Sequence, residues 1–196
     1  MGLAGLARRA LIPTLALAGL FAGCAHLPIL IVPRDPLSAE EHVRLGAAYE
    51  AQDLRKEAAE QYEFALKKDP AYVPAWMASG NASFEAGDFK NAERCFRRAL
   101  KLSPHHAGAA NNLAMIYLAQ NINLDEAERL ARWALAQDGP LKPYILDTLA
   151  NIDLRRKRYP EARAALDQAQ EIAPPENAAV RKRLLETRTL LDAARR

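Results

Sequence analysis

The sequence predicts an all-α fold, a solenoid of paired helices, and three observations lead to this prediction. Alanines recur at intervals of 34, 35 and 35 residues, at Ala58, Ala92, Ala127 and Ala162. A second series keeps the same step, at Ala65, Ala99, Ala134 and Ala169. Proline or Gly-Pro closes each unit, at Pro70, Pro104, Gly139-Pro140 and Pro174. A period near 34 residues with helical spacing indicates an array of helix-turn-helix units.

Length and charge limit the functions that the chain can have. A chain of 196 residues with only 9 Gly is long enough for one helical domain with a core. The formal charge is +3, and removal of Arg8 and Arg9 with a signal segment leaves about +1. This balance argues against nucleic acid as a partner. Two basic clusters, 155–158 and 181–183, are either solvated helix ends or contacts for an acidic partner or lipid headgroups.

The first 23 residues have the features of a secretory signal peptide. Arg8 and Arg9 precede an apolar stretch from Ala10 to Leu20, which is followed by small residues before Cys24. The stretch is shorter than the roughly 20 residues that a membrane-spanning helix needs. We therefore predict that residues 1–23 are a targeting segment and not part of the fold.

The end of this segment resembles the lipobox of bacterial lipoproteins. Ala22 and Gly23 directly precede Cys24, although Phe21 stands where Leu is usual. The resemblance implies a lipid anchor on Cys24, and Ala25 after it implies the bacterial outer membrane, with the protein facing the periplasm. The alternative is an ordinary signal peptide with an unrelated cysteine.

Residues 24–38 are predicted to be a flexible tether carrying the lipid. Pro28, Pro33 and Pro36 oppose helix formation around the apolar run Leu27–Val32. That run either lies in the lipid interface or folds back onto the first repeat. Ser38, with Glu41 three residues later, predicts a capping box that begins the first helix.

Residues 39–176 resemble tetratricopeptide repeats (TPRs), in four units: 39–72, 73–106, 107–142 and 143–176. The motif residues are Leu45, Gly46, Tyr49 and Tyr62; Trp76, Gly80 and Phe96; Leu113, Ala114 and Tyr117; and Leu149, Ala150 and Leu166, each with the alanines above. The third unit has one inserted residue within 120–124, and Ser83 and Asp153 replace an aromatic residue. The resemblance implies a right-handed α-solenoid.

The motif has a physical basis in close packing. Small residues at the eighth and twentieth positions of a unit let its two helices approach, and we expect truncation of Trp76 to cost about 3–5 kcal/mol. Residues 177–196 carry Val180, Leu184, Leu185, Leu190 and Leu191 among charges, and are predicted to be a capping helix. Cys95 is predicted to be a buried thiol.

No arrangement of residues predicts chemistry. The chain has no metalloprotease, nucleophile-elbow or phosphate-loop motif. His105 and His106 would point about 100° apart on a helix, without a nearby metal partner. We therefore expect neither an enzyme nor a cofactor or metal.

The TPR resemblance implies that the first helix of each unit lines a concave groove. Residues spaced i, i+4, i+7 share one helical face. The resulting sets are Val43, Ala47 and Glu50; Met77, Asn81 and Phe84; Asn111, Met115 and Leu118; and Asp147, Asn151 and Leu154. This mixture suits a peptide or partner helix, with Asn81, Asn111 and Asn151 as polar contacts. The alternative is that these asparagines bond to neighbouring helix ends.

These features predict a non-catalytic adaptor in the bacterial envelope that binds a protein or peptide in the groove. The layout is similar to pilotins of type IV pilus secretins, adaptors of peptidoglycan hydrolases and scaffolds of exopolysaccharide export. It therefore implies assembly of a pilus, secretion, export or cell-wall machine. The alternative is a permanent structural subunit or a self-assembling solenoid. The partner and the oligomeric state stay open.

Overall fold

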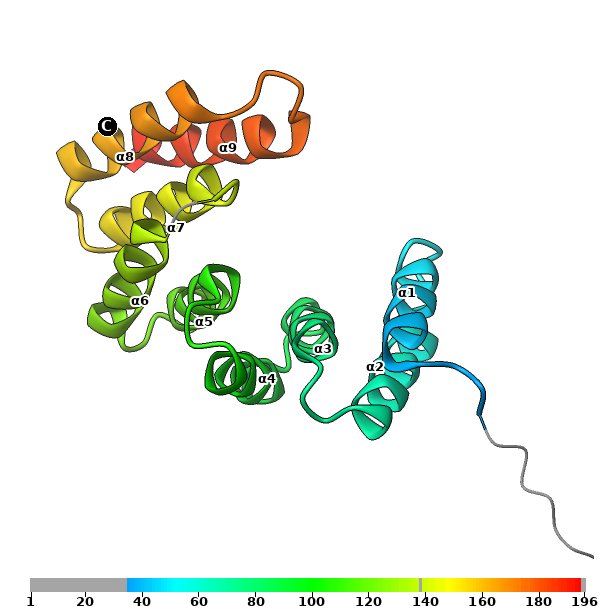
Figure 1. The fold of residues 1–196 in the computed structure, drawn as a ribbon. Helices are drawn as coiled ribbons and strands as arrows, with labels where there is room; N and C mark the ends of the chain where they lie inside the picture. Colours follow the sequence, from blue (N-terminus) through cyan, green and yellow to red (C-terminus); the bar gives the residue numbers. More distant parts are fainter. Residues whose placement is uncertain (1–34, 138, 195–196) are drawn as a thin grey trace, which may run out of the picture. The chain divides into compact units, whose positions relative to one another are not determined.

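The structure, a computed structural model, describes residues 35–137 and 139–194 (Figure 1). Within these residues the secondary structure is helical, which confirms the all-α prediction. The helices are α1 (Ala39–Glu50), α2 (Arg55–Lys68), α3 (Val73–Glu85), α4 (Phe89–Leu102), α5 (Ala107–Gln120), α6 (Leu124–Ala136), α7 (Lys142–Arg155), α8 (Tyr159–Ile172) and α9 (Ala178–Ala194). All belong to one compact unit, residues 36–196.

Three predicted features lie outside the described residues: the signal peptide, the lipidation site Cys24 and the apolar run 27–32. Among the helices that the structure does describe, none combines the length and apolar character that a membrane span requires.

The helices pack as successive pairs, as a helical-repeat solenoid requires. Each odd-numbered helix from α1 to α7 packs against the even-numbered helix that follows it, and also against the next odd-numbered helix. Over the described residues, the even-numbered helices contact no other even-numbered helix. The odd-numbered helices therefore form a continuous surface, here called the odd-helix face, and the even-numbered helices lie behind it (Figure 1).

The helix ends follow from local chemistry. Ser38 and Glu41 form the predicted capping box, with the Glu41 backbone N–H donating to Ser38 Oγ at 3.2 Å. The turns within the first, second and fourth pairs each place one residue at positive φ: Asp53, Gly87 and Lys157. The third turn places two there, Asn121 and Asn123. Asparagine tolerates this left-handed conformation, so the pair accommodates the one-residue insertion.

Small residues lie where the helices cross. The eight recurring alanines are all 0% exposed. An added Cβ on Gly46 would clash with the Tyr62 ring, and one on Gly80 would lie 2.6 Å from the Phe96 ring. In the third and fourth pairs the glycine is replaced by Ala114 and Ala150, and the matching aromatic residue by Ala131 and Leu166, all of them buried. The close approach thus depends on a small residue at the glycine position, and in the first two pairs that residue faces an aromatic ring.

One packing prediction is wrong. Trp76 is half-buried, with its Nε1 donating to the Pro70 carbonyl at 2.9 Å and the Arg94 guanidinium 5.5 Å from the ring centroid. Because solvent reaches the ring, truncation of Trp76 should cost less than the loss of a core tryptophan. The ring covers the turn between α2 and α3 and does not fill the core.

The last helix packs against α7 and α8. Val180, Leu184 and Leu191 are buried in a cluster with α7 and α8. Leu185 and Leu190 stay 62% and 59% exposed. Helix α9 thus occupies the place of a first helix of a further pair, and it covers the end of the stack with one of its faces.

Candidate functional site: a cavity on the odd-helix face

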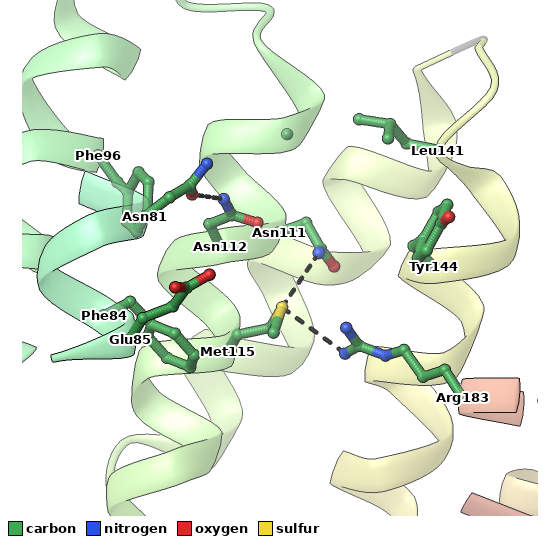
Figure 2. A pocket seen from close by; sticks show the side chains of 11 residues that line it. Asn81, Phe84, Glu85, Phe96, Asn111, Asn112, Met115, Leu141, Tyr144 and Arg183 are labelled. Carbon is green, nitrogen blue, oxygen red and sulfur yellow. Dashed lines mark hydrogen bonds between the residues drawn. The ribbon is translucent and has the colours of Figure 1, made fainter. Parts of the chain in front are cut away.

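Four of the predicted groove residues surround one cavity. Asn81 and Phe84 from α3, and Asn111 and Met115 from α5, line a hollow of about 420 Å³. Figure 2 shows Leu141 and Tyr144 on the opposite side, with Arg183 of α9 at one end. The cavity is completed by Glu85, Phe96, Gly108 and Asn112. The groove pattern therefore identified the α3 and α5 wall, but not the residues from α7 and α9.

An asparagine pair joins α3 to α5 at the cavity wall. Asn112 Nδ2 donates to Asn81 Oδ1 at 2.8 Å (Figure 2). Asn81 is exposed and Asn112 is half-buried. Asn81 therefore keeps its own amide N–H group at the surface, as the prediction of a polar contact requires.

Asn111 has an unusual environment within this cavity. Its side chain is 6% exposed, and its Nδ2 points at the Met115 thioether at 3.6 Å. Its Oδ1 is buried and accepts no hydrogen bond from any residue that the structure describes. A thioether is a weak acceptor, so the amide of Asn111 has poor partners on both sides. An unsatisfied buried polar atom costs about 1–3 kcal/mol.

The fourth repeat requires a correction. Asp147, predicted to face a ligand, is 1% exposed because α9 covers it. Its Oδ2 accepts from Arg183 Nε at 2.5 Å, and its Oδ1 accepts from Thr187 Oγ1 at 2.6 Å. Asn151 Nδ2 donates to Thr187 Oγ1 at 3.1 Å and to the Asp147 carbonyl at 2.9 Å. Asn151 therefore bonds within the protein, as the alternative prediction supposed, but to its own helix and to a residue in the middle of α9 and not to a helix end.

The remaining predicted residues fall into two groups. Val43, Met77, Leu118 and Leu154 are half-buried, and Ala47 and Glu50 are exposed. Met77, Phe84 and Leu118 pack against the core of the central helices, and Leu154 packs against the core shared with α8 and α9. These apolar side chains therefore hold helices together as well as presenting surface.

The basic cluster 155–158 forms ion pairs within the chain. Glu128 of α6 accepts from Arg156 Nη1 at 3.0 Å and from Arg158 Nη2 at 2.7 Å. Arg158 also pairs with Asp153 at 2.5 Å. Only Arg155 and Lys157 of this cluster are exposed. Arg156 and Arg158, predicted to be either solvated or contacts for an acidic partner or lipid headgroups, instead join the third and fourth repeats.

The two carboxylates of this network have pKa shifts of opposite sign. Burial acts to raise the pKa of Glu128, but hydrogen bonds from Arg158 and Arg132 outweigh it, so the pKa is lowered. Burial raises the pKa of Asp153, and Arg158 only partly offsets this effect. The difference arises because several arginines surround Glu128, whereas Asp153 has one close arginine.

Cys95 is 0% exposed, as predicted, with Sγ 3.6 Å from Ser79 Oγ. Burial raises the pKa of its thiol, which disfavours the reactive thiolate.

His106 caps α5, because its Nδ1 accepts from the Ala109 backbone N–H at 3.0 Å. Across the described residues, no three metal-ligating side chains gather in one place.

The sequence named Arg183 only as part of the basic cluster 181–183 and did not place it at the groove, because residues 177–196 were predicted to be a capping helix. A signal was available: Arg183 and Thr187 are four residues apart and so share one face of α9. A basic and a hydroxyl residue on an otherwise buried face require an acidic partner. Asp147 was the acidic residue among the groove positions of the neighbouring repeat.

Comparison with known families agrees with this geometry. Two family models, each described as a tetratricopeptide repeat, match residues 73–106 and 120–177. Among curated proteins, the chain is 25% identical over 104 residues to the tetratricopeptide repeat-containing protein trd-1 of Caenorhabditis elegans. It is 34% identical over 85 residues to the protein O-mannosyl-transferase TMTC1 of Mus musculus. These matches cover 53% and 43% of this chain, but only 13% and 9% of the two relatives.

Solved structures resemble the fold over a larger share of the chain. A thermophilic TPR protein of Thermus thermophilus has a TM-score of 0.64 and 22% identity, covering 81% of this chain and 84% of that one. The pilF protein of Pseudomonas aeruginosa has a TM-score of 0.63 and 21% identity, covering 82% and 74%. MamA has a TM-score of 0.59 and 20% identity, covering 68% and 77%. The two family models show that the chain carries tetratricopeptide repeats, at residues 73–106 and 120–177, and the solved structures, each below 25% identity, show the same fold.

Proposed function

We propose that this protein is a non-catalytic adaptor that binds a segment of a partner protein on its odd-helix face. TPR repeats are protein–protein interaction scaffolds, and TPR proteins are generally non-catalytic. The observation that carries the proposal is the cavity between α3, α5, α7 and α9, which has apolar walls and several polar atoms. Concave sites of this composition are the usual binding sites of proteins.

The proposed binding segment lies over α3 and α5 and ends at α9. Phe84 and Met115 provide apolar contacts on this part of the face, and Asn81 and Asn112 provide amide groups. On α7, the Asp147 carboxylate already accepts hydrogen bonds from Arg183 and Thr187 of α9. The partner therefore contacts the second and third repeats, and α9 takes the place of the partner at the fourth.

We further propose that the protein is anchored to the bacterial outer membrane through lipidated Cys24 and faces the periplasm. The support is the order of the first 24 residues: a basic start, a short apolar stretch and Ala22-Gly23-Cys24. A lipoprotein cysteine carries more than one acyl chain, and one chain alone anchors only marginally. Incorporation of radiolabelled palmitate into the wild type, and its loss in Cys24→Ser, is the expected result. Equal labelling of both proteins would contradict the anchor.

In this setting the adaptor serves assembly of an envelope machine, such as a pilus, secretion, export or cell-wall complex. The support is the combination of the proposed lipid anchor with the proposed binding surface. The resemblance to pilF and to the other solved structures supports the fold alone, since each identity is below 25%.

Site-specific photocrosslinking of the full chain in intact cells tests the adaptor role. A photoreactive residue at exposed Asn81 probes the odd-helix face, and matched probes at exposed Glu60 of α2 and Lys101 of α4 face away from it. We expect the Asn81 probe to capture one defined protein and the control probes not to capture it. Capture of the same protein by the control probes, with none at Asn81, would place the binding surface elsewhere.

A second function, as a permanent structural subunit, is favoured by one observation. Leu185 and Leu190 expose most of their side chains on α9, and exposed apolar side chains suit a constitutive interface. Mass photometry of the detergent-purified protein separates the two functions. A monomer supports an adaptor that exchanges partners. A stable oligomer that Leu185→Glu dissolves supports the structural role.

A further inference from the structure

We infer that the cavity beside Asn111 binds an uncharged amide group of the partner. The inference rests on the proposed function of the odd-helix face and specifies the chemistry that this face recognises. It is carried by the unsatisfied amide of Asn111, by the charges around the cavity and by its apolar walls.

The first argument comes from the hydrogen bonds of Asn111. Its Oδ1 is a buried acceptor without a partner among the described residues, and its Nδ2 has only the Met115 sulfur. A second donor, Arg183 Nη2, points at the same sulfur from 3.8 Å (Figure 2). Two strong donors, Asn111 Nδ2 and Arg183 Nη2, therefore point at the Met115 sulfur, which is a weak acceptor, while the strong acceptor Asn111 Oδ1 has no donor among the described residues. A ligand N–H group would donate to Asn111 Oδ1. A ligand C=O group would replace the Met115 sulfur as the acceptor for Asn111 Nδ2 or Arg183 Nη2.

The second argument comes from charge. The guanidinium of Arg183 is already paired with Asp147 at 2.5 Å, and Asp147 is 1% exposed. Glu85 adds a second carboxylate to the lining of the cavity. Together with Arg183, these two carboxylates leave a net negative charge, which disfavours a ligand carboxylate. A ligand cation has no acceptor for the Asn111 and Arg183 donors, whereas a neutral amide both donates and accepts.

The third argument comes from shape and flexibility. Phe84, Leu141 and Tyr144 provide apolar walls, and a volume of about 420 Å³ accommodates a side chain or one peptide unit. The Met115 side chain is half-buried, and methionine has three rotatable bonds. A ligand amide can therefore displace the thioether and reach the Asn111 amide without movement of a helix.

Two sources provide this chemistry: a main-chain peptide unit of the partner, or the side-chain carboxamide of Asn or Gln. Four small probes separate the possibilities. N-methylacetamide represents the main chain and butyramide represents the side chain. Butyrate and butylammonium are charged analogues of similar size.

Methyl NMR of the full chain with 13C-methyl methionine provides the readout. The sequence contains three methionines, Met1, Met77 and Met115. Met115 lines the cavity, whereas Met77 on α3 is outside the lining and serves as an internal control. We expect either amide to shift the Met115 signal saturably, with at least tenfold weaker binding of the charged probes. The stronger of the two amides identifies the source.

Variants separate a specific site from general binding. Asn111→Leu keeps the volume and removes the amide, so it should abolish the Met115 response to both amides. Asn91→Leu on α4, outside the cavity lining, should retain the response. Charged probes that bind as well as the amides, an unchanged response in Asn111→Leu, or no saturable shift would each overturn the inference. Partner capture at Asn81 would survive that failure, so the proposed function is tested separately.

Discussion

Matching positions in the third and fourth repeats have opposite environments. Asn111 on α5 and Asp147 on α7 both begin the predicted groove set of their helices. Asp147 accepts hydrogen bonds at both carboxylate oxygens, from Arg183 and Thr187 of α9. Asn111 has a buried oxygen without a partner among the described residues. Both positions are buried, but only Asp147 has its polar atoms satisfied by the next odd-numbered helix, so Asn111 is the candidate ligand contact.

This difference separates the odd-helix face into two parts. The part over α3 and α5 borders the cavity, and the part over α7 is covered by α9. Arg183 belongs to both, since it pairs with Asp147 and also lines the cavity.

The largest effect is expected for Arg183→Met. The methionine keeps much of the packing but leaves the Asp147 carboxylate, 1% exposed, without its charged partner. Loss of one member of a buried pair costs about 3–5 kcal/mol, and because the Arg183 side chain is itself 36% exposed, we expect a cost of about 3 kcal/mol. Urea denaturation monitored by circular dichroism measures the free energy of unfolding. Arg181→Met, at an exposed position of the same helix, is the control and should change stability by less than about 0.5 kcal/mol.

The same substitution at two asparagines should have effects of opposite sign. Asn111→Leu removes an unsatisfied acceptor and should raise the free energy of unfolding by about 1 kcal/mol. Asn151→Leu removes two hydrogen bonds, to Thr187 and to the Asp147 carbonyl, and should lower it by about 1–2 kcal/mol. Denaturation of both variants in parallel checks this. If Asn111→Leu destabilised the protein as much as Asn151→Leu, Asn111 would have a structural partner.

A smaller effect is expected from pH, at the junction of the third and fourth repeats. The pKa of Glu128 is lower in the folded protein than in the unfolded chain. The stabilisation that ionised Glu128 provides is therefore at its full size above the pKa of the unfolded state, about 4.3. It is lost as the pH falls through the pKa of the folded state. Asp153, whose pKa is raised in the folded protein, has the opposite effect, since its contribution to the free energy of unfolding increases as the pH falls.

Comparison with Glu128→Gln isolates the contribution of Glu128. From pH 7 down to pH 3, the stability advantage of the wild type over this variant should stay constant until about pH 4.3 and then decrease, as measured by melting temperature. At pH 7 the variant should be about 1–3 kcal/mol less stable, since it leaves Arg156 and Arg158 without one charged partner. A constant difference across this range would show that Glu128 does not titrate differently on folding.

Local and periodic signals predicted most of the fold. The alanine series marks the helix crossings because only a small side chain permits the close approach there. Ser38 and Glu41 predicted the start of α1 because a capping box acts within one turn. Trp76 was predicted wrongly because the motif identifies its position, whereas its burial depends on what packs above the turn.

The site was predicted only in part, and for a physical reason. Period and helical spacing place Asn81, Phe84, Asn111 and Met115 on one face, and the structure brings them around one cavity. Whether Asp147 is open or covered depends on α9, whose Arg183 lies 36 residues later in the chain. No repeat position encodes that contact. The arginines of 155–158 were similarly ambiguous, because their partner Glu128 belongs to the preceding repeat.

The most direct test of the two-part face is the rate of cysteine labelling by a maleimide. In a Cys95→Ala background, Asn81→Cys reports on the open part and Asn151→Cys on the part under α9. We predict that Asn81→Cys reacts rapidly in the purified protein and at least tenfold more slowly in the cell envelope, where the partner is present. Asn151→Cys should react slowly in both settings. Rapid labelling of Asn151→Cys in the purified protein, or equal rates for Asn81→Cys in the two settings, would contradict the account.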